Sequence, residues 1–274
     1  MLDVLVHCDD YHAFGSGPRY AAGLAASLGA TLTGLYVAPR IPALPPPEAP
    51  PSLTSEFLGF VHDEIAQAQR AKDGFGRLAE SAGVHSWHWQ LAIGSLGESL
   101  AAAGNWNDVI VLERRERVPH YAVEPIAEAL RSGVPCIVLR EGADGYLEPR
   151  RVVIAWNGSV QAMRALHSAL PILRRARQIH LLVSPAPVHM STVVCEPGFS
   201  PERYLHQHGC LVQTTALPHN QRSAEDAILI ASATLGADLL VMGAYGRKPA
   251  ADGDPRGATD FLLQQATLPL FLRH

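Results

Sequence analysis

The sequence has little charge, few aromatic residues and no long apolar run. Charged residues make up 18% of the 274 residues and give a formal net charge of -4, so the basic excess typical of nucleic-acid-binding proteins is missing. Aromatic residues contribute 7%. No apolar run reaches the roughly 18 residues that a membrane span needs. We therefore expect neither a nucleic-acid partner nor a membrane partner.

Cysteine is scarce, and its spacing suggests no disulfide or redox motif. The four cysteines form no C-x-x-C pair, and Cys8 and Cys136 lie within apolar runs, where a reduced thiol packs as a small hydrophobe. The first ten residues, MLDVLVHCDD, have neither the basic segment nor the long apolar segment of a secretion signal. Both observations predict a cytoplasmic protein.

The motifs of common enzyme classes are also missing. The sequence has no G-x-S-x-G elbow, no Walker A lysine motif and no H-E-x-x-H. Ser159 follows a predicted strand, but it is well placed to cap a helix, and nothing identifies a general base for it. We predict that the protein is not an enzyme, with slow ATP hydrolysis as the most that nucleotide binding would bring.

What the sequence does have is a regular alternation of short apolar runs and longer helical patterns. The runs cover residues 3–8, 31–37, 87–93, 108–113 and 134–139, then 151–156, 179–184, 211–217, 238–242 and 268–272. Several are apolar at successive positions, as in strands that helices cover on both faces. This pattern predicts parallel sheets of the α/β class. A long helix is expected over about 55–82.

The two halves of the chain resemble each other. NWNDVIVL (105–112) parallels LGADLLVM (235–242), and GVPCIVLR (133–140) parallels TLPLFLR (267–273). The matched Asp and Pro are 27 positions apart in the first half and 31 in the second, which therefore has the longer loop. We predict two domains, residues 1–142 and 148–274, joined by a linker containing Gly and Pro.

Glycine-rich turns follow two predicted strands of the second half. VVIAW runs into Asn157-Gly158-Ser159, and LLVM runs into Gly243 and Gly246. In an open parallel sheet, ligands bind beyond the carboxyl ends of the strands. Glycine lets the backbone approach an anion, and free N–H groups at a helix start favour negative charge. Such turns are also common in α/β proteins without a ligand, so the pattern alone leaves both interpretations open.

A group of histidines and cysteines raises the question of a metal site. Cys195, His206, His208 and Cys210 fall within 16 positions, and imidazole with thiolate suits zinc. Their spacing matches no standard zinc finger, and the two histidines would point to different sides of a helix. We therefore predict no metal, with surface histidines and isolated thiols at these positions.

Three segments resemble the universal stress protein family in their order and spacing. They are RVVIAWNGS (151–159), LGADLLVMGAYG (235–246) and GATDFLLQQATLPLFL (257–272), with weaker counterparts in the first half. The resemblance implies two tandem five-stranded parallel-sheet domains with the Rossmann-like fold of adenine nucleotide alpha hydrolases. It implies that these domains pair within the chain, with a homodimer or an unknown protein as a further partner. It also implies a non-catalytic role in stress response.

Some family members bind ATP through G-x-x-G, nine residues and then G-[ST], with an Asp after the first strand, and others bind no nucleotide. The resemblance implies a partial ATP or AMP site in the second domain. Beside the base and ribose it places Ala155 and Asn157, and beside the phosphates Gly243, Gly246, Arg256, Gly257 and Thr259.

The sequence departs from this signature at several positions. Arg256 replaces a phosphate-contacting glycine, where it would either clamp a phosphate or fill the pocket. Asn157 replaces the usual Asp, and Asp252 and Asp254 would repel a triphosphate. We favour a weakened or lost site. The alternative is a nucleotide-free scaffold or sensor that takes a protein partner, an apolar ligand or a metal.

The first domain departs further from the signature. Glu113-Arg-Arg-Glu116 stands where the second domain has glycines, so no phosphate cradle is expected there. Asp9 and Asp10 follow the first strand, and we interpret them as solvated carboxylates of a turn.

Overall fold

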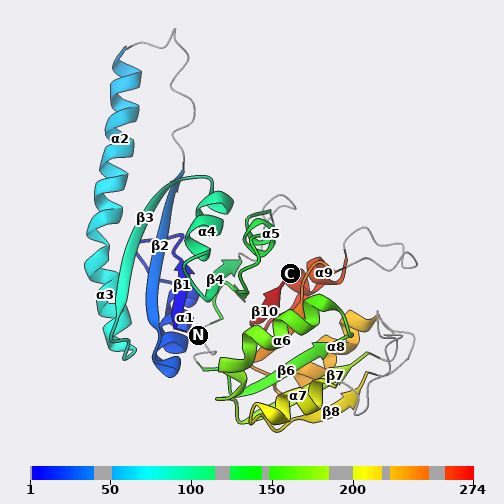
Figure 1. The fold of residues 1–274 in the computed structure, drawn as a ribbon. Coiled ribbons are helices and arrows are strands. Elements are labelled where there is room, and N and C mark those ends of the chain that lie inside the picture. The colour runs from blue at the N-terminus through cyan, green and yellow to red at the C-terminus, as the bar shows by residue number, and fades with distance from the viewer. Residues whose placement is uncertain are drawn as a thin grey trace.

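The computed structural model describes residues 2–39, 51–114, 124–143, 148–184, 200–217, 223–246 and 257–274. A ten-stranded sheet runs through the molecule in the order β3-β2-β1-β4-β5-β10-β9-β6-β7-β8, with helices on both of its faces (Figure 1). The first half contributes β1 (Asp3–His7), β2 (Thr31–Pro39), β3 (Trp87–Gly94), β4 (Val109–Arg114) and β5 (Cys136–Arg140). The second half contributes β6 (Arg151–Trp156), β7 (Gln178–Val183), β8 (Gln213–Ala216), β9 (Leu239–Gly243) and β10 (Leu270–Arg273). Each strand overlaps one predicted apolar run, which confirms the α/β class.

The helices divide between the two faces of the sheet. On one face lie α1 (Ser16–Leu28), α3 (Lys72–Ser81), α6 (Val160–Leu173) and α7 (Pro201–Gln207), whose buried side chains share one core cluster. On the other lie α4 (Leu96–Gly104), α5 (Glu124–Arg131), α8 (Ala224–Thr234) and α9 (Ala258–Gln265), which share a second cluster. None of the helices in the described ranges is both long enough and apolar enough to cross a membrane.

The single helix predicted over about 55–82 is wrong, because two helices cover this range. The long α2 (Pro51–Arg70) ends before Ala71, and α3 follows it. Trp89 Nε1 donates to the carbonyl oxygen of Ala68, which holds the end of α2 on the sheet. In α3, Gly76 leaves room for Trp87, since a Cβ atom there would stand 2.4 Å from the indole ring. The break at Ala71 thus separates a helix that continues past the sheet from one that packs closely on β3 (Figure 1).

The two halves repeat the same strand order and meet in the middle of the sheet. Within each half, neighbouring strands are parallel. Between the halves, β5 and β10 are antiparallel, with Leu270 opposite Val138 and Leu272 opposite Cys136. The carboxyl ends of the strands therefore face opposite edges of the sheet in the two halves. Both core clusters contain side chains from both halves, so the halves share their core.

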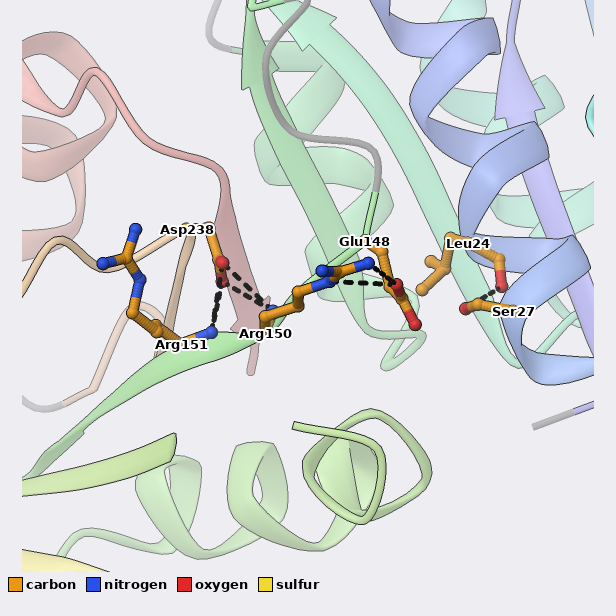
Figure 2. Close-up of polar contacts among 6 residues, drawn as sticks. All are labelled: Leu24, Ser27, Glu148, Arg150, Arg151 and Asp238. Atoms are coloured by element: carbon orange, nitrogen blue, oxygen red, sulfur yellow. Dashed lines mark hydrogen bonds and ion pairs between the residues drawn. The ribbon is translucent and has the colours of Figure 1, made fainter. Parts of the chain in front are cut away.

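The residues that repeat in the sequence make the same hydrogen bonds in both halves. Asp108 accepts from the backbone N–H groups of the first residue of β1 and of the residue before it, and Asp238 accepts from the corresponding two at the start of β6. Figure 2 shows the second of these arrangements, beside the exposed ion pair of Arg150 with Glu148. The carbonyl oxygens of Pro135 and Pro269 accept from the second residue of β4 and of β9. The repeated Asp and Pro residues therefore lie where hydrogen bonds join the central strands of each half, β1, β4 and β5 in the first and β6, β9 and β10 in the second.

Candidate functional site

Gly243 ends β9 and lies directly against the first turn of α6. A Cβ atom built on Gly243 would stand 2.5 Å from the backbone nitrogen of Ala162 and 2.6 Å from the carbonyl carbon of Gln161. Real Cβ atoms essentially never come within 3.0 Å of such atoms, so only glycine lets the helix approach this closely. Helix packing alone therefore requires Gly243, one of the glycines that match the family's nucleotide signature, whether or not a ligand binds.

The turn after Gly243 is held by Tyr245, which has a left-handed backbone with φ of 49°. Its N–H donates to Thr259 Oγ1 at 2.9 Å, and its phenol donates to Asp260 Oδ1 at 3.1 Å. Burial, together with the carboxylate of Asp260, raises the pKa of the phenol. These two bonds hold the turn that ends at Gly246 close to the start of α9. In the chain, residues 247–256 separate the two.

The start of α9 supplies the groups that would meet a phosphate. Gly257 is its N-cap and makes no side-chain capping bond. Thr259 is buried and accepts from the backbone, which leaves its hydroxyl hydrogen to donate. Asp260 places a carboxylate in the first turn, where the helix dipole favours it and where it would repel a phosphate.

The turn after β6 is closed on itself. Asn157 is exposed, and its Oδ1 accepts the N–H of Ser159 at 3.1 Å. Ser159 Oγ in turn accepts the N–H of Ala162 at 3.1 Å, which confirms that it caps α6. Ala155 lies two residues earlier on β6 and is half-buried against the core cluster of α8 and α9.

The structure therefore brings together the turns after β6 and β9 and the start of α9, and Arg256 lies outside the described residues. Sequence reasoning missed Gln161, whose side chain lies between the two glycines. Its Oε1 stands 3.6 Å from where a Cβ on Gly246 would be and is the nearest atom among the described residues. The sequence gives no direct signal for this contact, because Gln161 precedes these glycines by several elements.

Glu113 occupies the position in the first half that Gly243 occupies in the second, as the strand registers show. Its carboxylate accepts the hydroxyl of Ser16 at 2.5 Å and the N–H of Gly17 at 3.1 Å, at the start of α1. A helix start attracts anions through its free N–H groups and its dipole. In the first half the protein's own carboxylate fills this position.

Asp10 shapes the turn that leads from β1 to α1. Its Oδ1 accepts the N–H groups of His12 and Ala13, at 2.7 and 3.3 Å. This is the local bond that aspartate commonly makes in a turn, as predicted. Asp9 beside it is also exposed.

The histidines around α7 form a surface stack. Tyr204 lies between the rings of His167 and His208, with 4.5 Å between ring centroids on each side. Arg174 Nη2 stands 3.1 Å from His208 Nδ1, so a guanidinium occupies the place of a metal there. His206 is exposed and Cys210 is buried, while Cys195 lies outside the described residues. Within the described ranges no group of three or more His, Cys, Asp or Glu side chains could hold a metal ion.

A hollow of about 590 Å³ lies in the first half, between β3 and α4. Leu91, Ile93 and Trp106 are among the residues that line it, and the Trp106 side chain is 85% exposed. The hollow belongs to the half of the sheet that lacks the glycine turns. It therefore has no part in the nucleotide-type site.

Comparisons with known proteins identify the architecture. Neither family models nor curated proteins match the sequence. A solved universal stress protein from Archaeoglobus fulgidus DSM 4304 matches with a TM-score of 0.68 and 15% identity, covering 99% of this chain and 95% of its own. The chain has the universal stress protein fold. The fold that the resemblance implied is confirmed over the whole tandem length.

Two further structures share the universal stress protein fold with this chain. One is a putative universal stress protein from Pseudomonas aeruginosa UCBPP-PA14, with a TM-score of 0.53 and 13% identity. The other is a functionally unknown protein from Pseudomonas aeruginosa PAO1, with a TM-score of 0.54 and 12% identity. Each match covers 99% of this chain and 92% of the other. At such identities the match shows the fold alone.

Proposed function

We propose that this protein is a non-catalytic, cytoplasmic stress-response protein whose second half binds an adenine nucleotide weakly. The observation that carries the proposal is the difference between the halves at one strand end. Glu113 fills the start of α1 with a carboxylate, whereas Gly243 leaves the corresponding turn without one. In this proposal the first half is closed to phosphate, and the second half accepts it at the turn of Gly246.

In this proposal the nucleotide lies across the carboxyl ends of β6 and β9. Ala155 and Asn157 flank the base and ribose. The backbone at Gly246 and at the start of α9 faces the phosphates, to which the Thr259 hydroxyl donates. Arg256 replaces the glycine of the family signature, and we expect it to hinder the phosphates more than it holds them.

Two features make us expect weak binding. The N–H of Tyr245 already donates to Thr259, so this donor is lost to a ligand. The Asp260 carboxylate stands in the first turn of α9, and its charge opposes that of a phosphate. Dissociation constants near the millimolar range would correspond to only about 4 kcal/mol of binding free energy.

The cytoplasmic placement rests on the cysteines. Cys8, Cys136 and Cys210 are free and buried, which suits a reducing compartment. The proposal of a non-catalytic role rests on the absence of enzyme motifs in the sequence. Phosphate release measured at saturating ATP tests that role, and turnover above the buffer background would contradict it.

Calorimetric titration with ATP and Mg²⁺, and separately with AMP, tests the nucleotide proposal. Saturable heat that disappears in Gly246→Val supports it, because the added side chain would project from the turn at which the proposal places the phosphates. The matched control is Gly59→Val, which changes an exposed glycine of α2 with nothing among the described residues within 4 Å of the added Cβ and should leave the heat unchanged. No heat at millimolar nucleotide would refute the proposal. Arg256→Gly should tighten binding, and weaker binding would assign a clamp role to the arginine.

The second candidate function is a nucleotide-free scaffold or sensor that binds a protein partner or a second copy of the chain. One observation favours it: the site groups already have internal partners, as Tyr245 with Thr259 and Asn157 with Ser159 show. Silent titrations together with a saturable protein partner, or with self-association in sedimentation, would favour this function.

A further inference from the structure

Two arginines of the second half converge beside the carboxyl end of β10. Arg273 reaches from β10 toward α6, where its Nη1 donates to the hydroxyl of Ser168. Its Nε is buried and has no hydrogen-bond partner among the described residues. Arg164 lies one helical turn before Ser168 on α6, and its Nη1 donates to the backbone oxygen of His274 at 3.5 Å. The two guanidinium groups therefore share one small region on the α6 face of the sheet.

In the described part of the chain, neither arginine forms an ion pair with an Asp or Glu side chain. Burial lowers the pKa of Arg273, and the charge of Arg164 lowers it further. Two like charges close together repel each other, and a buried donor without an acceptor is also unfavourable. An anion between the guanidinium groups would relieve both.

The first half shows that the fold does not need charge at this location. The strand registers place Leu139 at the position of Arg273. Tyr20 and Leu24 are the fifth and ninth residues of α1, as Arg164 and Ser168 are of α6. All three residues of the first half are at most 1% exposed and belong to one apolar cluster. In the second half, two arginines and a serine have replaced this apolar packing.

We propose that Arg164, Arg273 and Ser168 bind an oxyanion of the phosphate class. Guanidinium groups present forked donors that match the oxygens of a phosphate, and the serine hydroxyl adds a further donor. The anion would lie on the α6 face, whereas α9 and Thr259 lie on the opposite face. This site is therefore separate from the phosphate position of the proposed nucleotide site.

Inorganic phosphate is the probe for the test, at constant ionic strength. We expect the melting temperature to rise with phosphate concentration and ³¹P NMR titration to give a saturable shift. Arg164→Gln should weaken phosphate binding by roughly tenfold, because it removes a charge-assisted hydrogen bond. Arg273→Leu should abolish it and keep the fold, since leucine is the residue of the first half. The matched control is Arg175→Gln, which removes the same charge from an exposed position after α6 and should leave binding unchanged.

Several outcomes would overturn the proposal. Phosphate that neither raises the melting temperature nor shifts in the NMR titration would do so, as would equal losses in Arg164→Gln and Arg175→Gln. Binding that occurs only after removal of His274 would show that its backbone oxygen already serves the arginines, and would also overturn it. Glycerol phosphate distinguishes the sources of the anion: tighter binding than inorganic phosphate indicates a phosphomonoester, and equal or weaker binding indicates the free ion. Gly246→Val should retain phosphate binding, which separates this site from the nucleotide site.

Discussion

The packing of α6 on β9 predicts opposite effects for the two glycines of the turn. In Gly243→Ala, the new methyl group meets backbone atoms of Gln161 and Ala162 at 2.5–2.6 Å. These atoms belong to the first turn of a helix and cannot rotate away, so α6 itself must shift. In Gly246→Ala, the nearest atom of the described residues is the end of the Gln161 side chain at 3.6 Å, an ordinary contact.

The expected magnitudes follow from these distances. Overpacking usually costs about 1–3 kcal/mol, and a clash with backbone belongs at the upper end, so we expect a loss of about 3 kcal/mol for Gly243→Ala. For a chain of this size that corresponds to a fall of roughly 6–12 °C in melting temperature. Replacing glycine by alanine also restricts the unfolded chain, which stabilises a tolerated variant by about 0.4–1 kcal/mol. Gly246→Ala should therefore be neutral or slightly more stable than the wild type.

Urea unfolding followed by tryptophan fluorescence and circular dichroism measures both variants. The variants are compared by the urea concentration at the midpoint of unfolding, provided that the slopes of their unfolding curves are equal. Equal slopes show that the unfolded state has not changed, so that a shift in midpoint reports packing in the folded state. Equal midpoints for Gly243→Ala and Gly246→Ala would refute the assignment of Gly243 to helix packing. If nucleotide titration shows binding, Gly246→Ala should weaken that binding without lowering the free energy of unfolding. Gly243→Ala cannot separate the two effects, because it also disturbs the packing of α6.

Variants at three further positions test the bonds around the strand ends. Glu113→Ala should lower the free energy of unfolding by about 2 kcal/mol, because it removes the acceptor of the Ser16 hydroxyl and of a helix N–H. An unchanged urea midpoint would contradict this prediction. Thr259→Val should lower the free energy of unfolding by about 1–2 kcal/mol while Thr259→Ser stays near wild type, and equal losses would show that the hydroxyl bond to Tyr245 does not stabilise the fold. Burial raises the pKa of Asp238, so its folded form holds a proton more tightly than the unfolded chain. The free energy of unfolding of the wild type minus that of Asp238→Asn should therefore be greatest below a pH of about 3.8 and should fall as the pH rises through the raised pKa. A difference that grows toward neutral pH would contradict this prediction.

The strands could be predicted because their signal is local. Apolar residues at successive positions mark a strand covered on both faces, and the repeated Asp and Pro make the same backbone bonds in each half. The antiparallel pairing of β5 with β10 was not predictable from periodicity, since both strands are apolar throughout. The boundary between residues 142 and 148 stays a prediction, because the two halves share both core clusters.

The place of the candidate site was predictable, and the roles of its residues were not. Turns at strand ends carry their signal in Asn, Gly and Ser, and the structure brings the turns after β6 and β9 together. A glycine, however, has the same appearance in sequence whether a helix or a ligand approaches it. Gly243 faces α6, which precedes it in the chain by several elements, so only the fold shows which approach applies. The left-handed backbone of Tyr245 had no signal at all, because tyrosine seldom adopts it.

The two halves fill one small space between strand end and helix start in reciprocal ways. In the first half the strand supplies a side chain, Glu113, and the helix supplies Gly17, whose Cβ would stand 3.1 Å from the carboxylate. In the second half the strand supplies Gly243 and the helix supplies Gln161 at the corresponding position. Either arrangement closes the packing between sheet and helix. Only the arrangement of the first half also brings a negative charge to the N–H groups of the helix start. Whether the strand or the helix supplies the side chain therefore decides which half can still accept an anion there.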